Sequence, residues 1–300
     1  MQRQQSVSES YGGLPVRYGL RLVTVTSCLT AVLLAVVAVA GLLFGARGLY
    51  RPDPATLPAF LGQDAITLLA VLPLLLWSVR SAVRGSLRGL LLWTAALFYV
   101  AYSYAYYVLS PEFNMLYPAY IAIVAMSLYG CLYLLLATDA HAVAERFGSG
   151  APVRAAGAFL MVLPLGLGMA WVSMIVAALA GGQMPKRVDQ VVWPMDLIVA
   201  FPAMFWAGLW LWRRQPLGYV VAAVLLVKGG LLGVTLVINT WIAATFWGAA
   251  ADPAVPVYAL GGLGGLALAV RYLRHLRPDA RLASTSDEPT PVQQAYSQAA

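Results

Sequence analysis

The sequence predicts an all-α fold, a polytopic integral membrane helix bundle with eight transmembrane helices. Of its 300 residues, 61% are hydrophobic and only 10% are charged, whereas soluble domains carry about 25% charged residues. The apolar residues form runs long enough to cross a bilayer core, which takes roughly 20 helical residues. A soluble fold of this length could not cover so much apolar surface. We therefore predict a multi-pass protein of the cell membrane with the lipid bilayer as its main partner.

Short polar connections separate the eight predicted spans. The spans cover residues 20–44, 60–79, 87–109, 113–137, 155–181, 193–212, 217–246 and 255–275. Residues 1–16 form a polar N-terminal segment, residues 17–276 the membrane domain, and residues 277–300 a tail of disordered composition. The first apolar run spans about 23 residues, longer than the 7–15 of a cleaved signal peptide, so we expect it to be retained.

The basic residues are distributed unevenly among the connections. Of the 19 Lys and Arg residues, 14 lie before the first span, after spans 2, 4 and 6, or after span 8. Four lie in the opposite connections, and the remaining one is Lys228. Cytoplasmic connections of membrane proteins are enriched in Lys and Arg, so both termini are predicted to be cytoplasmic. Membrane topology accounts for the net charge of +7, and no nucleic-acid partner is predicted.

Two stretches, starting at Gln63 and at Met195, follow the same order of residue types. Each has an acid, a proline, a tryptophan and then arginines: Asp64, Pro73, Trp77 and Arg80 in the first, Asp196, Pro202, Trp212 and Arg213 in the second. A 4+4 duplication would relate spans 1–4 to spans 5–8 by an axis along the membrane normal. Alternatively, the match reflects only the arginines that helix hairpins share at their cytoplasmic ends.

Asp64 and Asp196 are costly residues, because carboxylates are expensive inside a bilayer. One interpretation places each in the first turn of a helix, where the helix dipole stabilises negative charge. The other places them in a cation-attracting vestibule on the exterior side, together with Gln63 and Glu112.

Lys228 interrupts the apolar run VAAVLLVKGGLLGVTLVIN. It lies 12 residues after Pro216, or about 18 Å along a helix, close to the middle of a core about 30 Å thick. A lysine stem cannot reach either surface from there, so Lys228 is predicted to face the bundle interior. An intramembrane lysine is a functional hypothesis by default; the alternative is a purely structural polar contact.

Tyrosines are the first candidate partners of Lys228. Tyr99, Tyr102 and Tyr106 share one helix face by their spacing, and the deeper two, Tyr99 and Tyr102, are predicted to face inward, because a phenol in lipid lacks a partner. Tyr106 and Tyr107 are predicted to belong to an interfacial aromatic belt. Backbone groups freed near a proline are further candidates, whereas the acids are predicted to lie nearer the exterior. Asn239 lies three turns beyond Lys228 on a similar face.

Glycines are concentrated in the last two spans. Gly229 and Gly233, and Gly261 and Gly265, have the G-x-x-x-G spacing that lets helices approach closely. We expect a close hairpin between spans 7 and 8. The same faces also offer a route to a homo-oligomer.

The motifs of several enzyme classes are missing from the sequence. Of the two histidines, His141 lies in a polar connection and His275 at the last residue of the eighth predicted span, which excludes a haem ligated by histidines within the membrane. There is no H-E-x-x-H, C-x-x-C or G-x-S-x-G motif either. The sequence therefore indicates no catalytic residue, no cofactor and no metal, and an enzyme is not favoured.

The stretch GQDAITLLAVLPLLL, followed by YVAYSYAYYVLSPEFNMLYPAYIA, resembles a group of uncharacterised bacterial multi-spanning membrane proteins. The resemblance covers residues 55–140 and, more loosely, PLGYVVAAVLLVKGGLLG. It implies an integral protein of a bacterial inner membrane and carries no activity with it.

Three functions are compatible with these features. The simplest is a structural, accessory or sensor protein whose polar residues only hold the bundle together. The second is a transporter of a small molecule or ion that uses Lys228 and the exterior-side acids, and it should have a polar cavity reaching Lys228. The third is a membrane enzyme acting on lipid or quinone, which should gather Asp64, Asp196 or Glu112 around one open pocket.

Overall fold

A computed structural model describes residues 13–50, 57–109, 113–185, 187–248, 250 and 252–277. The described chain is built of helices, and its two β-bridges are isolated. Seven of its helical segments are long and apolar enough to cross a membrane: Arg21–Arg47, Leu57–Val83, Tyr117–Ala137, Val153–Ala180, Asp189–Trp212, Pro216–Phe246 and Val255–Arg274. The chain is thus a polytopic helical membrane protein.

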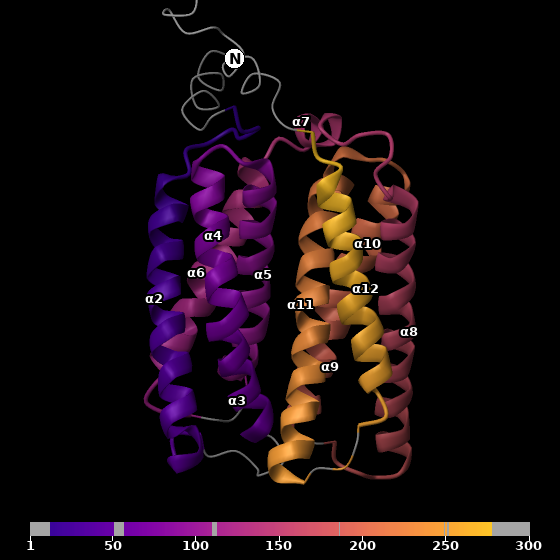
Figure 1. Ribbon diagram of the computed structural model, residues 1–300. Coiled ribbons are helices and arrows are strands. Elements are labelled where there is room, and N and C mark those ends of the chain that lie inside the picture. Colours follow the sequence, from indigo (N-terminus) through magenta and orange to yellow (C-terminus); the bar gives the residue numbers. More distant parts are fainter. Residues whose placement is uncertain are drawn as a thin grey trace, which may run out of the picture.

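The helices form two groups that stand side by side (Figure 1). The first group contains α2 (Arg21–Phe44), α3 (Leu57–Ile66), the π-helical turn η2 (Thr67–Val71), α4 (Leu72–Val83), α5 (Leu87–Leu109) and α6 (Tyr117–Ala137). The second contains α8 (Val153–Ala180), α9 (Arg187–Met195), the π-helical turn η3 (Asp196–Ala200), α10 (Phe201–Trp212), α11 (Pro216–Trp247) and α12 (Val255–Arg274). The short elements are η1 (Gly45–Arg47) and α7 (Ala140–Glu145).

The helix α5 corresponds to the third predicted span. It has 23 residues, most of them buried, and packs against α4, α6 and α11. It is not among the seven segments with the composition of a span, because its tyrosines make it less apolar. Its neighbours cover those tyrosines, so little of α5 faces outward.

Some helix boundaries differ from the prediction. The span predicted at 193–212 is preceded by α9, which begins at Arg187 and joins η3 and α10 without a break. The span predicted at 113–137 begins only at Tyr117, since Asn114 turns the chain there: its side chain accepts the Leu116 N–H at 2.9 Å. In the first case polar residues that were predicted as a loop are helical, and in the second a polar turn was included in the predicted span.

Two continuous helical segments, α3–η2–α4 and α9–η3–α10, each contain a π-helical turn shortly before a proline. η2 precedes Pro73 and η3 precedes Pro202. Proline donates no backbone hydrogen bond and its ring collides with the carbonyl four residues earlier, so an α-helix is strained there. The wider π-helical turn, in which an N–H bonds to the carbonyl five residues earlier, relieves that collision. Leu72 N–H bonds to Thr67 O and Phe201 N–H to Asp196 O in this way.

The closest helix pair is α11 and α12, as the glycines predicted. The contact uses Gly230 and Gly233 against Gly262 and Gly265, so the contacting glycines are spaced by three residues on each helix. Gly229 instead faces Met204. The glycines available for a homo-oligomer through these helices are thus largely engaged within the chain.

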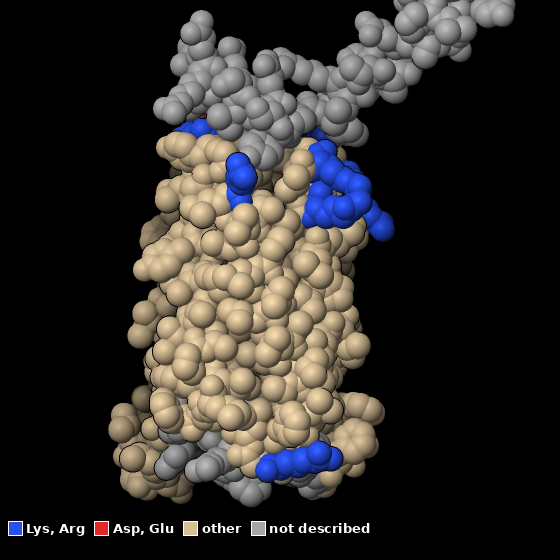
Figure 2. Space-filling view, turned by 90° about the vertical axis from the view of Figure 1, so that its left-hand side faces the viewer, with Lys and Arg blue, Asp and Glu red and all other residues tan. Residues whose placement is uncertain are grey.

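One end of the bundle is tied together across both groups. Arg88, at the start of α5, donates at 2.9 Å to the carbonyl of Leu276, which follows α12. Arg146 donates at 2.7 Å to the carbonyl of Gly13. This is the end at which α2 begins and α7 lies (Figure 1). The helix ends and connections there hold most of the described arginines: Arg17, Arg21, Arg80, Arg84, Arg88, Arg146, Arg154, Arg213, Arg214, Arg271, Arg274 and Arg277. Figure 2 shows a wide band without charged residues between basic residues at the two ends.

Candidate functional site: a buried polar chain between the helix groups

Lys228 lies where α11 packs against α5. Its side chain is 1% exposed, and Nζ lies 3.5 Å from the centroid of the Tyr102 ring and 5.9 Å from that of Phe98. An ammonium above an aromatic face is attracted by the ring quadrupole. Among the described residues, no hydrogen bond reaches Nζ, and the ion pair within 4.0 Å joins Arg17 to Asp139 instead. The predicted inward orientation of Lys228 agrees with this geometry.

Tyr102 connects Lys228 to Asp196. The Tyr102 hydroxyl donates to Asp196 Oδ1, while the indole Nε1–H of Trp171 donates to Oδ2 at 2.9 Å. Asp196 is 7% exposed and attracts the Lys228 ammonium electrostatically. A continuous polar chain therefore runs from α8 through η3 and α5 to α11. We call Trp171, Asp196, Tyr102 and Lys228 the polar chain.

Neither buried acid lies in the first turn of a helix, so that interpretation is wrong. Asp196 begins η3 and is preceded by the helical turns of α9, which start at Arg187. Asp64 is the eighth residue of α3, which starts at Leu57. Because each helix begins earlier than predicted, both acids lie two turns or more inside it and are held by side-chain donors.

Asp64 is surrounded by tyrosines of the first group. Tyr50 OH donates to Oδ2 at 2.6 Å and Tyr107 OH to Oδ1 at 3.2 Å. Asp64 is 1% exposed and Tyr107 2% exposed. Burial raises the pKa of the Tyr50 phenol, which lies outside the spans, so this phenol keeps its proton and donates. The assignment of Tyr107 to an aromatic belt is therefore wrong.

Tyr99 takes part in a second hydrogen-bond network, whose described members do not include Lys228. Its hydroxyl lies 2.8 Å from Thr235 Oγ1 and 3.3 Å from the Gln63 side chain. Gln63 also donates at 3.3 Å to Thr67 Oγ1. This network links α3, η2, α5 and α11, so it joins both helix groups beside the polar chain.

Two further predicted residues lie apart from the polar chain. Asn239 is partly buried beside Gly62, and its Oδ1 has no hydrogen-bond partner within the described part of the chain. Glu112 lies outside the described residues.

Five residues of these hydrogen-bond networks were not among the candidates: Tyr50, Thr67, Tyr107, Trp171 and Thr235. Trp171 carried a signal in the sequence, because an indole N–H inside a predicted span needs an acceptor. Tyr50 carried none, since its connection to α3 gives no indication of where it folds.

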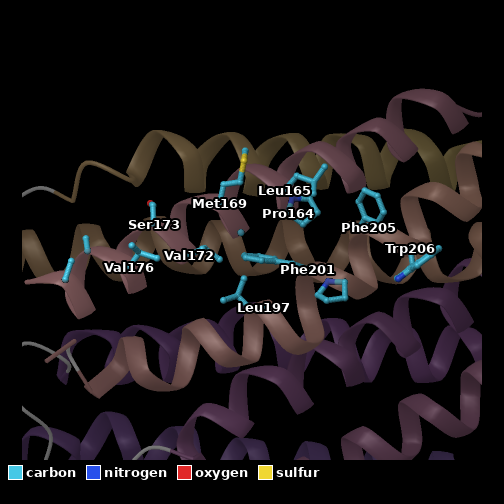
Figure 3. A pocket seen from close by; sticks show the side chains of 14 residues that line it. Pro164, Leu165, Met169, Val172, Ser173, Val176, Leu197, Phe201, Phe205 and Trp206 are labelled. Carbon is cyan, nitrogen blue, oxygen red and sulfur yellow. The ribbon is translucent and has the colours of Figure 1, made fainter. Parts of the chain in front are cut away.

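The structure also contains an apolar groove of about 840 Å³, with α8 on one side and η3 and α10 on the other. Figure 3 shows Val172 of α8 next to Phe201 of α10 and Leu197 of η3, while the side chain of Met169, also in the lining, points away from them. Ser173 is the polar side chain in its lining, and Lys228 does not line it. The groove is therefore not the polar cavity expected to reach Lys228.

Comparisons with known proteins add no family to this picture. No protein-family model, no curated protein and no solved structure matches the chain. The resemblance to bacterial multi-spanning proteins stays a prediction. Composition and fold together identify the chain as a multi-pass helical membrane protein with a buried polar chain between two helix groups.

Proposed function

We propose that the protein transports a small anion, and that Lys228 binds this anion between the two helix groups. The observation that carries the proposal is Lys228, a residue that is 1% exposed and whose ammonium donates no hydrogen bond to any described residue. An ammonium has three N–H donors. A buried charge whose donors stay unsatisfied is costly, and an aromatic face compensates for only part of that cost.

The partners of Lys228 suit a site that alternates between two states. Asp196 supplies a compensating negative charge, but Tyr102 lies between them and both carboxylate oxygens already accept hydrogen bonds. A bound anion would accept directly from Nζ.

We further propose that the two helix groups arose by duplication, which brings the number of spans to eight with α5 included. Support comes from helix boundaries separated by a constant 129 residues. Thr67 and Asp196 begin the two π-helical turns, Leu72 and Phe201 begin α4 and α10, and Leu87 and Pro216 begin α5 and α11. Parallel repeats of this kind are known in transporters, whose sites lie at the repeat interface.

The connections that follow α4 and α10 also correspond to each other at a separation of 129 residues. Gly85 and Arg214 both have positive φ, at 90° and 55°. Gly89 and Gly218 each lie so close to the preceding helix that a Cβ would meet backbone atoms, of Ala82 in the first case. The exposed tryptophans that correspond are Trp77 and Trp206. This alignment of the two halves is shifted by three residues from the one predicted from the sequence, which paired Asp64 with Asp196.

When the two helix groups are aligned at this separation, they differ at the candidate site. Tyr99 corresponds to Lys228, and Thr67 corresponds to Asp196. The first half thus has neutral hydrogen-bonding groups where the second has a cation and an anion. A scaffold that needed only packing would have no use for this pair of charges in one half, which favours a functional role for the polar chain.

The arginine distribution supports an orientation with both termini in the cytoplasm. Most described arginines lie at the end where α2 begins (Figure 1), and basic connections favour the cytoplasmic side. The anion would then move between the end that carries α7 and the opposite end.

The test uses ligand-induced stabilisation of the purified protein in detergent. A panel of sodium salts of small anions, including chloride, nitrate, acetate, lactate and phosphate, is screened by thermal unfolding, because a ligand of the native state raises Tm. Anions that stabilise are then measured for uptake into proteoliposomes. We expect stabilisation and uptake in the wild type and the loss of both in Lys228→Met.

Two results would contradict the proposal. The first is a panel in which no anion raises Tm. The second is uptake that Lys228→Met leaves unchanged, which would assign Lys228 to packing and favour an accessory role.

A further inference from the structure

We propose that Asp64 and the tyrosines around it form a binding site for a small monovalent cation, with Na⁺ as the best fit. The inference concerns the first helix group and uses no residue of the polar chain. It rests on a buried acid with no cation beside it among the described residues, on two buried hydroxyls without hydrogen-bond partners there, and on the close packing of the surrounding rings.

The first argument is the balance of charge. Asp64 is 1% exposed and accepts hydrogen bonds from Tyr50 and Tyr107. Two phenols stabilise a carboxylate but do not neutralise it. Asp196 has the same kind of support from two donors and, in addition, the attraction of Lys228. Among the described residues Asp64 has no corresponding cation. Within the described part of the chain, an ionised Asp64 therefore lacks a compensating positive charge.

The second argument is the presence of two unsatisfied hydroxyls beside the same acid. Tyr104 and Tyr120 are each 1% exposed, and their hydroxyls have no hydrogen-bond partner within the described part of the chain. Their rings lie 5.0 Å from the ring of Tyr107. Both phenols are close enough to Asp64 for an electrostatic interaction. Polar side chains lie near each of them without forming a hydrogen bond: Thr67 near Tyr104, and Tyr50 and Asn114 near Tyr120. A cation on Asp64 would give each hydroxyl oxygen a role as a ligand.

The donor set and the space select the cation. The site offers a carboxylate and phenol oxygens, the hard donors that alkali and alkaline-earth ions prefer. Divalent ions usually take several carboxylates, and the described residues contain no group of three His, Cys, Asp or Glu arranged for a metal. An organic ammonium would not fit, because the rings of Tyr107 and Phe60 pack edge to face with centroids 4.9 Å apart and Gly41 packs directly on Asp64.

The experiment measures thermal unfolding of the full chain in detergent by tryptophan fluorescence. N-methyl-D-glucamine chloride is replaced stepwise by NaCl, LiCl or KCl at constant total chloride, so that anion binding at Lys228 stays constant. We expect a saturable rise in Tm that is largest with Na⁺. Asp64→Asn should abolish the rise, and the matched control Asp196→Asn should keep it.

Two outcomes overturn the proposal: no cation-specific rise in the wild type, which would mean that Asp64 carries a proton, or a rise that persists in Asp64→Asn. Should Asp64→Asn fail to fold, Tyr104→Phe and Tyr120→Phe replace it. Each should raise the Na⁺ concentration at half-saturation several-fold, and unchanged titrations would overturn the site. The measurement does not depend on transport. The cation site can therefore be disproved while the anion proposal stands, and the anion proposal can be disproved while the cation site stands.

Discussion

The Lys228 ammonium lies against the face of Tyr102, 3.5 Å from the ring centroid, while the hydroxyl of the same ring donates to Asp196. One tyrosine therefore contacts the cation with its ring and the anion with its hydroxyl. The two charges interact through an intervening side chain, which makes their energetic coupling measurable.

Thermal and denaturant unfolding of Lys228→Met, Asp196→Asn and the double variant should show this coupling. Each single variant leaves one buried charge without its compensation, whereas the double variant removes both. We expect the double variant to be more stable than the sum of the single effects predicts, with a coupling of about 0.5–3 kcal/mol. Additive effects would mean that Lys228 and Asp196 do not interact.

Tyr102→Phe and Tyr102→Leu separate the two roles of this side chain. Tyr102→Phe keeps the ring above Lys228 but removes the donor to Asp196 Oδ1, at an expected cost of about 1–3 kcal/mol for the unsatisfied carboxylate. Tyr102→Leu removes the ring as well and should cost more. Equal losses of unfolding free energy in the two variants would show that the ring contributes nothing to holding the cation.

Gly233→Ala should destabilise the contact between α11 and α12. A Cβ at Gly233 would lie 2.7 Å from the carbonyl oxygen of Tyr258, and backbone atoms cannot move aside easily. The matched control is Gly229→Ala, whose Cβ would meet only the flexible Met204 side chain at 3.8 Å. We expect a lower Tm for the first variant and an equal or higher Tm for the second, because alanine favours helix. The opposite order would contradict the glycine contact.

Single-cysteine labelling tests the proposed orientation. In a background with Cys28 and Cys131 replaced by serine, Ser149→Cys and Met184→Cys place an exposed thiol at opposite ends of the bundle. A membrane-impermeant maleimide added to intact cells should label Met184→Cys and leave Ser149→Cys unlabelled until the cells are lysed. The reverse pattern would place the termini outside.

The depth and inward direction of Lys228 could be predicted from the sequence, since they depend only on helix rise and side-chain length. Tyr102 was among its predicted partners for the same reason. The surroundings of Asp64 could not be predicted. Tyr50 reaches it from another part of the chain, and Tyr107 becomes buried only when Phe60 and Tyr50 pack over it. Contacts between distant segments leave no periodic pattern in the sequence.

The roles of Asp64 and Asp196 were predicted less well because the helix starts were misplaced. Polar residues such as Asp189 and Gln190 indicate a loop by composition, yet they form the first turns of α9. The π-helical turns also escaped prediction. They insert one residue without changing residue type, so hydrophobic periodicity does not reveal them.

The π-helical turn η2 has a consequence for how the buried acid is aimed. One extra residue in a turn rotates everything before it by about 100° relative to everything after it. Deleting a single residue between Thr67 and Val71 would replace the π-helical turn by an α-helical one, strained at Pro73, and would turn Asp64 away from Tyr107 with every side chain of the cluster still present. The direction of this carboxylate thus depends on the number of residues in η2. An insertion or deletion there would move the buried negative charge to another face of the helix without changing any charged residue.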